Sequence, residues 1–158
     1  MDDAQRRELI ERYKQGPAVL REAVAGLTDA ELDHRPGPDD WSPRMVVHHC
    51  ADSELTSAIR LRRLLAEDRP QIQGYDQDEF ARKLYYDRPH ETSLELFKYA
   101  RLATAELLER LQPADWLREG THSESGPYSV ETWLTIYAQH AHKHARQIRE
   151  ARGAAQKA

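Results

Sequence analysis

Two histidines spaced four residues apart, His140 and His144, are the side chains of this sequence whose arrangement most clearly suggests chemistry. On an α-helix, that spacing separates two residues by about 40° around the axis and by about 6 Å along it. Two imidazoles in this arrangement can converge on one ion, with metal–nitrogen bonds of about 2.0 to 2.1 Å. His142 lies about 200° from His140 by the same arithmetic, so we expect it to face away from the pair. The spacing indicates two ligands of a metal site.

A third ligand would complete such a site, and the best candidates are the adjacent residues His48 and His49 on another predicted helix. Three other histidines fall in predicted loops, namely His34, His90 and His122. His49 shares one stripe of its helix with Met45, whereas His48 is displaced from that stripe by about 100°. Apolar and small residues, however, occupy much of the circumference of this helix. The periodicity therefore favours His49 and leaves His48 open.

Three neutral imidazoles would leave a divalent ion its full charge and at least one open position, which is typical of catalytic zinc sites. Such an ion lowers the pKa of a coordinated water towards about 7, giving hydroxide for hydrolysis, or binds a thiol as the thiolate. Imidazole ligands suit zinc, nickel, iron or copper, and abundance favours zinc. Metalloproteases of the H-E-x-x-H type carry a glutamate directly after the first histidine, where this sequence has Ala141. The ligand set by itself does not choose between hydrolysis and thiol chemistry.

Asp52 is the candidate for a catalytic group beside the metal, because it follows His49 by about one helical turn. It could orient a ligand ring or accept a proton, although a carboxylate on a helix more often forms an ordinary ion pair. Glu54 and Glu131 are weaker candidates for the same role. Aromatic residues that could line a pocket over the ion, or fill the core, are Trp41, Trp133 and Tyr137.

The helices that must position these residues follow from the apolar spacing. A first helix is predicted over residues 4–27, with a bend or brief interruption at Gly16 and Pro17. Thr28 and Glu31 match a capping box that opens a short helical turn.

Three further long helices carry the candidate ligands and the rest of the core. Ser42 can cap a helix that reaches about residue 67, and Ser129 can cap a final helix that reaches about residue 152. Between them, a helix that starts near residue 92 should present an apolar face up to Leu111.

The segment between the second and third long helices, residues 68–91, is long for a compact bundle, and this length permits a crossover between parallel neighbours. The sequence shows no convincing strand pattern, internal repeat or linker between domains. We therefore predict an all-α four-helix bundle with a long crossover between helices two and three. It should form one domain over residues 1–158, with a frayed polar tail after Arg152.

Composition argues against several classes of partner. The 158 residues include 27 acidic and 23 basic side chains, for a formal net charge of −4. The basic residues are scattered, whereas phosphate binding needs a concentrated basic surface, so we expect no nucleic-acid partner. No segment approaches the roughly 18 apolar residues of a membrane span, and residues 1–7 lack the apolar run of a signal peptide, so we predict a cytoplasmic protein without a membrane partner. Cys50 is the only cysteine, and we expect its side chain to be buried and to pack as a small hydrophobic group.

Three segments resemble the DinB-like superfamily, and specifically its YfiT branch: W-S-P-R-M-V-V-H-H-C-A-D-S-E at residues 41–54, G-Y-D at residues 74–76 and Y-A-Q-H-A-H-K-H at residues 137–144. The match in order and spacing covers nearly the whole chain. The resemblance implies a four-helix bundle with a long second connection, and three histidines that bind nickel or zinc. In the family's motifs the second histidine of V-V-H-H is a ligand, which is His49 here, and the H-x-x-x-H pair is His140 and His144. The resemblance also implies a homodimer, for which the residues themselves give no separate indication.

The resemblance further implies a metal-dependent enzyme that acts on a small molecule. YfiT-like proteins are described as metal-dependent hydrolases, and related bundles transfer low-molecular-weight thiols such as bacillithiol or mycothiol to electrophiles. We favour thiol S-transfer, because thiolate attack can proceed without a general base, which the sequence does not obviously supply. A hydrolase that uses metal-bound hydroxide is one alternative, and a metal-stabilised stress-response module without turnover is another. A further alternative has the histidines hydrogen-bonded in the core without metal.

Overall fold

The computed structural model describes residues 1–155 and contains the four long helices that the apolar periodicity predicts. These are α1 (Asp3–Val24), α3 (Pro43–Ala66), α5 (Glu91–Leu108) and α6 (Val130–Ala155). Two short helical elements, α2 (Asp29–Asp33) and the 3-10 turn η1 (Asp115–Leu117), lie between them. The predicted frayed tail after Arg152 is wrong for residues 153–155, which are helical, and otherwise lies outside the described residues.

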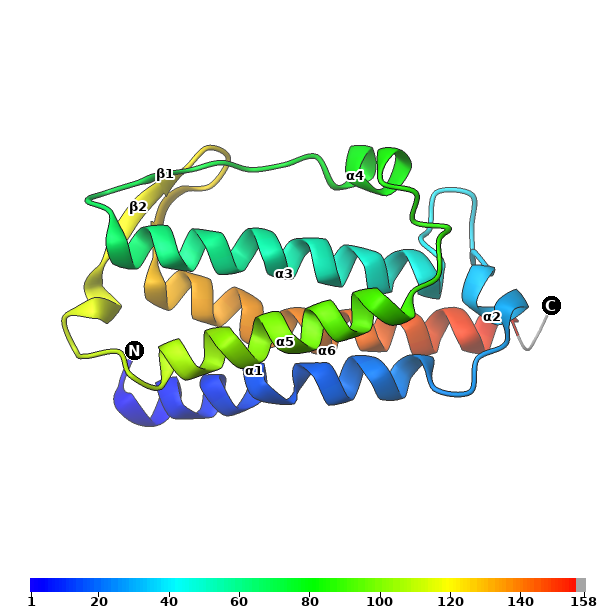
Figure 1. Cartoon of the computed structure of the whole chain (residues 1–158), viewed down its shortest axis with the longest axis horizontal. Coiled ribbons are helices and arrows are strands. Elements are labelled where there is room, and N and C mark those ends of the chain that lie inside the picture. Colours follow the sequence, from blue (N-terminus) through cyan, green and yellow to red (C-terminus); the bar gives the residue numbers. More distant parts are fainter. Residues whose placement is uncertain (156–158) are drawn as a thin grey trace.

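The long helices form two parallel pairs (Figure 1). α3 and α5 are neighbours and both run from right to left in this view, whereas α1 and α6 are neighbours and both run from left to right. Residues 67–90 return the chain from the end of α3 to the opposite end of the bundle, where α5 begins. Parallel neighbours need a connection that spans a whole helix, which accounts for its length. The predicted four-helix bundle with a long crossover is confirmed.

The crossover and the segment before α6 contain short strands, which corrects the prediction of a chain without strands. β1 (Gln71–Ile72) pairs in parallel with β2 (Glu119–His122), and β2 pairs with β3 (Gly126–Ser129) in an antiparallel hairpin. The crossover also contains the short helix α4 (Gln77–Lys83). Strands of two to four residues are too short to show the alternating pattern that identifies a strand in a sequence.

The predicted helix caps are present, because a short polar side chain precedes each start. The Thr28 side chain accepts a hydrogen bond from the third residue of α2 in a full capping box. At the start of α3, the Ser42 hydroxyl accepts from the backbone N–H of Met45, and at the start of α6 the Ser129 hydroxyl accepts from that of Thr132. Each cap satisfies a backbone donor that the helix leaves free.

α1 is continuous through Gly16 and Pro17, so the predicted interruption is wrong, and a bend at this point stays a prediction. Proline has no N–H, which leaves the carbonyl of Tyr13 without its partner in the helix. The buried guanidinium of Arg101, from α5, occupies this gap, where its Nη1 donates to the Tyr13 carbonyl at 2.7 Å. A Cβ atom at position 16 would collide with the same nitrogen, which accounts for the glycine. A tertiary contact therefore sustains the helix where its local sequence would weaken it.

The core fills the space between the four long helices along the length of the bundle. α6 contributes the inward face that the apolar spacing predicts, with Trp133, Tyr137, Ala141, Ala145 and Ile148 all buried. Phe97 of α5 is buried among residues of the other helices. No helix within residues 1–155 is long and apolar enough to cross a membrane.

Candidate metal centre

α3 and α6 pack against each other (Figure 1) and bring three histidines together. One ring nitrogen from each of His49, His140 and His144 lies within 4.8 Å of the other two. The ring centroids are 5.3 Å apart for His49 and His140, 4.7 Å for His49 and His144, and 4.5 Å for His140 and His144. The structure thus joins the three residues that were predicted as ligands, and within residues 1–155 it joins no other group of three His, Cys, Asp or Glu side chains in this way.

The adjacent histidine, His48, belongs to the core and not to this cluster. It is fully buried, and its Nδ1 lies 2.8 Å from the Ser93 hydroxyl while its Nε2 lies 2.9 Å from the Arg88 carbonyl. Both ring nitrogens therefore have partners within the protein. The choice that helical periodicity leaves open falls on His49. His142 lies at the edge of α6, where its Nε2 is 3.0 Å from the Arg12 carbonyl.

Burial keeps the clustered imidazoles neutral. It lowers the pKa of His49 from 6.5 to about 3, with a smaller contribution from the neighbouring His144. Burial also lowers the pKa of His140 well below its ordinary value, and the pKa of His144 is lowered for the same reason. Neutral imidazole is the form that binds a metal ion, so the cluster is ready to bind one at neutral pH.

Two ring nitrogens of the cluster lack a hydrogen-bond partner among the described residues. The Nδ1 atoms of His49 and His140 are buried and unpaired. A buried polar atom without a partner costs roughly 1–3 kcal/mol, and for this reason such atoms usually meet water, an ion or a ligand. Imidazoles that converge on one point and are left unpaired by the protein fit a divalent metal ion.

Gln147 orients the third imidazole. Nδ1 of His144 lies 2.8 Å from the side-chain oxygen of Gln147, one turn further along α6. Because an amide oxygen only accepts hydrogen bonds, this ring nitrogen carries the proton, and the lone pair is on Nε2. The hydrogen bond thereby selects the nitrogen that can bind an ion.

We expect Gln147→Ala to weaken metal binding by about 10- to 100-fold, because metal-binding histidines depend on the partner of their second nitrogen. A competition titration of zinc against a chromophoric chelator measures this change. Arg146→Ala, on the exposed face of the same helical turn, is the matched control and should leave the affinity unchanged. Equal affinities in the two variants would show that the Gln147 hydrogen bond does not orient a ligand.

The lowered pKa values predict how the stability of the metal-free protein depends on pH. An unfolded histidine gains a proton below about pH 6.5, whereas folded His49 stays neutral to about pH 3. The unfolded state therefore binds more protons in this window, and the free energy of unfolding falls as the pH decreases below about 6.5. Each such histidine contributes a slope of up to about 1.4 kcal/mol per pH unit.

Urea denaturation of the chelator-treated protein at a series of pH values measures this slope. We expect a shallower slope for His49→Ala, because that variant lacks one of the groups whose protonation favours the unfolded state. His34→Gln, which replaces a histidine outside the cluster, should keep the slope of the wild-type protein. A His49→Ala slope equal to the wild-type slope would contradict this account.

Aromatic rings lie against the histidines on two sides. The Trp41 ring is 4.8 Å from that of His49, and the Tyr137 ring is 5.7 Å from that of His140, measured between centroids. A cavity of about 200 Å³ is lined in part by Trp41 and by Gln147, the residue that contacts His144. Trp133 instead fills the core, where its indole N–H donates to the Ser57 carbonyl.

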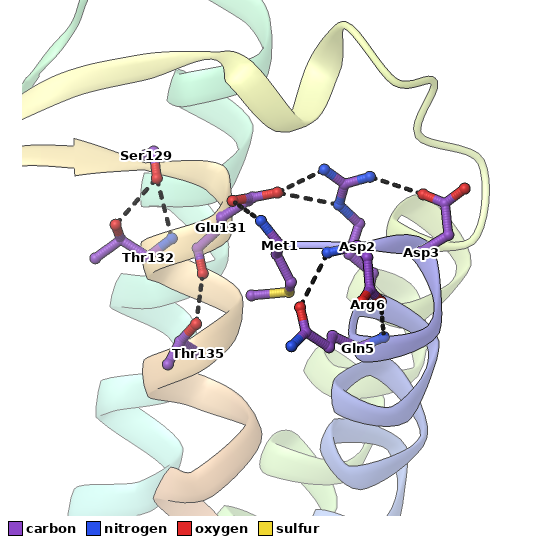
Figure 2. A network of polar contacts seen from close by, with 9 residues as sticks. All are labelled: Met1, Asp2, Asp3, Gln5, Arg6, Ser129, Glu131, Thr132 and Thr135. Atoms are coloured by element: carbon purple, nitrogen blue, oxygen red, sulfur yellow. Dashed lines mark hydrogen bonds and ion pairs between the residues drawn. The ribbon is translucent and has the colours of Figure 1, made fainter.

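The acidic residues considered as possible bases all have partners of their own. Asp52 accepts a hydrogen bond of 2.7 Å from the Tyr86 hydroxyl, and Glu54 forms a fully buried ion pair with Arg101. Glu131 lies at one end of the bundle, where Figure 2 shows it bound to the guanidinium of Arg6. A role for Asp52 in orienting a ligand or accepting a proton stays a prediction. None of the three carboxylates is among the residues that cluster with the histidines.

The sequence reasoning missed a polar group beyond Tyr137 that includes Arg60 and Tyr75. Arg60 follows His49 by three turns of α3, so it lies on nearly the same face of the helix, and this spacing was the available signal. Tyr75 belongs to the crossover, and no local pattern indicates that it contacts α3. Its neighbour Asp76 caps α4, in agreement with turn chemistry. Cys50 is buried, and burial raises the pKa of its thiol.

Comparison with known proteins shows similarity over most of the chain. A sequence profile of the DinB superfamily matches residues 12–148, which include the three clustered histidines. A protein of Oceanobacillus iheyensis named "Putative metal-dependent hydrolase" is 35% identical over 141 residues, which are 89% of this chain and 82% of that protein. A protein of Bacillus subtilis named "Putative metal-dependent hydrolase YfiT" is 31% identical over 148 residues, which are 92% of this chain and 83% of that protein.

The fold is also similar to that of a solved structure. YfiT from Bacillus subtilis, described as having an unusual four-helix bundle topology, superposes with a TM-score of 0.91 at 29% sequence identity. The superposition covers 96% of this chain and 87% of that one. The similarity therefore includes the crossover and the helices that carry the histidines.

Proposed function

The chain belongs to the DinB superfamily, and we propose that it is a metal-dependent enzyme in which His49, His140 and His144 hold a divalent ion, zinc or nickel, that activates a low-molecular-weight thiol for transfer to an electrophile. One observation carries the choice of thiol transfer. Asp52, Glu54 and Glu131 are each engaged with another side chain, and none of them belongs to the cluster of three histidines, so no carboxylate is grouped with the ion site as an evident general base. A reaction that needs no protein base is therefore favoured.

The residues of the site have distinct tasks in this reaction. When bound, the ion would lower the pKa of a thiol that coordinates it, so that a thiolate is available near neutral pH. The buried imidazoles stay neutral and supply the lone pairs, and Gln147 keeps that of His144 on Nε2. The rings of Trp41 and Tyr137 lie against those of His49 and His140 and form an apolar wall beside them. Burial raises the pKa of Tyr137, so its hydroxyl stays protonated and can donate a hydrogen bond.

The transfer itself forms one bond and breaks one. The sulfur electron pair attacks an electrophilic carbon, a sulfur–carbon bond forms, and the bond from that carbon to its leaving group breaks. The leaving group departs with the bonding electrons, and the thiol proton is released to solvent. No oxidant or reductant takes part, so the site needs only to bind and deprotonate the thiol and to position the electrophile.

Hydrolysis is the second candidate, and the names of the relatives favour it. The names of the proteins from Oceanobacillus iheyensis and Bacillus subtilis both contain the words "Putative metal-dependent hydrolase". The same three-histidine site could activate water, in place of a thiol, as the nucleophile. In that case a proton acceptor has to come from the substrate, from solvent or from Asp52 after it releases Tyr86.

A conjugation assay with zinc-loaded protein tests the proposal. The protein is incubated with 1-chloro-2,4-dinitrobenzene and with bacillithiol, mycothiol or glutathione in separate reactions, and the thioether is measured by absorbance. We expect conjugate to form faster than with His49→Ala protein for at least one thiol. A p-nitrophenyl ester without thiol is the parallel assay for hydrolysis.

The two assays separate the candidates. Thioether formation that depends on His49 supports thiol transfer, whereas ester cleavage that depends on His49 without any conjugate supports hydrolysis. Rates equal to those of His49→Ala in every reaction would overturn the proposal of thiol transfer.

A further inference from the structure

Arg60 of α3 is a partly buried cation with no carboxylate partner among residues 1–155. Its Nη2 donates to the Gln73 carbonyl at 2.7 Å, its Nη1 makes a long contact of 3.4 Å with the Tyr137 hydroxyl, and the Tyr128 hydroxyl lies beside the same guanidinium. Its Nε is buried and has no hydrogen-bond partner. A guanidinium removed from water is normally paired, because its desolvation is costly. The arrangement leaves a positive charge and donor groups available to a ligand.

Hydroxyl groups surround this cation. The Arg60 Cζ lies 5.8 Å from the centre of the Tyr75 ring, and the Tyr75 hydroxyl is buried without a hydrogen-bond partner. Ser53, which is buried, lies beside the hydroxyls of both Tyr75 and Tyr137. Tyrosine hydroxyls carry their proton at neutral pH, so both can donate to an acceptor. Unpaired donors on a cation and on neighbouring hydroxyls fit an oxygen anion.

Tyr137 connects this polar group to the three histidines. Its ring contacts the ring of His140 while its hydroxyl faces Arg60. On its other side, Arg60 lines a cavity of about 370 Å³ together with the apolar side chains of Leu55, Ile59 and Ile72. Tyr137 therefore bridges Arg60 and His140, which places the cation one side chain away from the three histidines.

We infer that Arg60, with the hydroxyls of Tyr75 and Tyr137, forms a subsite for a carboxylate carried by the substrate of the histidine site. This inference rests on the proposed function, whose site it extends. The single charge of Arg60 matches a monoanion, because the other arginine that lines the cavity, Arg63, is already paired with Glu67. A planar guanidinium also matches the geometry of a carboxylate.

Isothermal titration calorimetry of the zinc-loaded protein tests the subsite. The probes are ω-mercaptocarboxylates of increasing chain length and, as neutral counterparts, mercaptoalcohols of the same length. We expect the wild-type protein to prefer the carboxylate of one length, and Arg60→Gln to lose about 10- to 100-fold in affinity for it, the usual effect of a charge-assisted hydrogen bond. Arg60→Gln should bind the neutral thiols as the wild-type protein does.

Arg63→Gln is the matched control, because Arg63 lies on the same helix, lines the same cavity and also donates to a carbonyl of the crossover. It should bind both kinds of thiol as the wild-type protein does. Tyr75→Phe should reduce the preference for the carboxylate by a smaller factor. Elemental analysis must show the same zinc content in all variants, since none of these residues is a ligand.

The possible outcomes distinguish the subsite from the site that it extends. Tight binding of neutral thiols, with no preference for a carboxylate that depends on Arg60, would overturn the subsite and leave the proposed function in place. The assignment of a monoanion would be overturned if Arg60 increased the affinity for a mercaptoalkylphosphonate more than it increased the affinity for the carboxylate. Failure of the zinc-loaded wild-type protein to bind any of these thiols would overturn both proposals.

Discussion

His49→Ala and His140→Ala are each expected to lower the affinity for zinc by more than about a hundredfold. Loss of a residue that merely orients a ligand costs about 10- to 100-fold, and these variants remove a ligand itself. The remaining two imidazoles would have to share the ion with water, and a two-histidine site on one or two helices is no longer of the three-ligand type found in catalytic zinc proteins. Competition against a chelator and elemental analysis after gel filtration measure the loss.

The same variants should lose the stabilisation that bound metal provides. A ligand that binds only the folded state stabilises it by about 4 kcal/mol at a free concentration a thousand times its dissociation constant. Zinc at that concentration should therefore raise the melting temperature of the wild-type protein by much more than that of His49→Ala. Both variants should fold without metal, because the core does not depend on these side chains.

His142→Ala is the matched control for this prediction. His142 lies between the two clustered histidines of α6 but points to α1 instead of the cluster, where its Nε2 lies near the Arg12 carbonyl. It should bind zinc with the wild-type affinity and stoichiometry. Retention of stoichiometric zinc in both His49→Ala and His140→Ala would mean that the zinc binds elsewhere and that the three histidines are not its ligands.

Arg101→Met is expected to destabilise the fold by about 3–5 kcal/mol, the usual result of removing one partner of a buried ion pair. Arg101 is 1% exposed and Glu54 is 1% exposed, and their charges lie 2.8 Å apart in the centre of the bundle. The guanidinium also donates to the carbonyls of Tyr13 in α1 and Tyr137 in α6. One side chain of α5 thus satisfies acceptors on the three other long helices, and its loss removes the charge partner of Glu54, which keeps only the hydrogen bond from the Tyr13 hydroxyl. Urea denaturation measures the change in the free energy of unfolding.

A double-mutant cycle with Glu54→Gln separates the charge pair from the other contacts. We expect each single variant to be strongly destabilised, and the double variant to lose less than the sum, because it leaves no unpaired buried charge. The exposed pair of Lys14 and Glu109 is the control, and removing either partner should change the stability far less, because solvent screens the two charges. Additive effects at Arg101 and Glu54 would show that their charges do not interact in the folded state.

The parts of the fold that depend on local chemistry were predictable. The long helices follow from apolar residues at three- and four-residue spacing, and their starts follow from Ser42 and Ser129, whose hydroxyls bond to backbone atoms of the same helix. The pair His140 and His144 was predictable for the same reason, since one helix carries both residues and sets their distance. The three short strands were not, because strands of two to four residues show no alternating pattern and β1 forms only by pairing with β2, which is far away in the chain.

The sequence by itself therefore determined the helices, their caps, and the metal-binding spacing within α6, all of which rest on interactions over four residues or fewer. The tertiary structure decided which face of α3 meets α6, and it joins to the pair His49, which the periodicity favoured and the family motif implied, while His48 lies in the core. The tertiary structure also decided that Arg101 sustains α1 at Pro17 and that Tyr75 of the crossover reaches Arg60. These contacts depend on how whole helices rotate and pack against one another. Many side chains together determine that packing through their volumes, so no local sequence pattern predicts it.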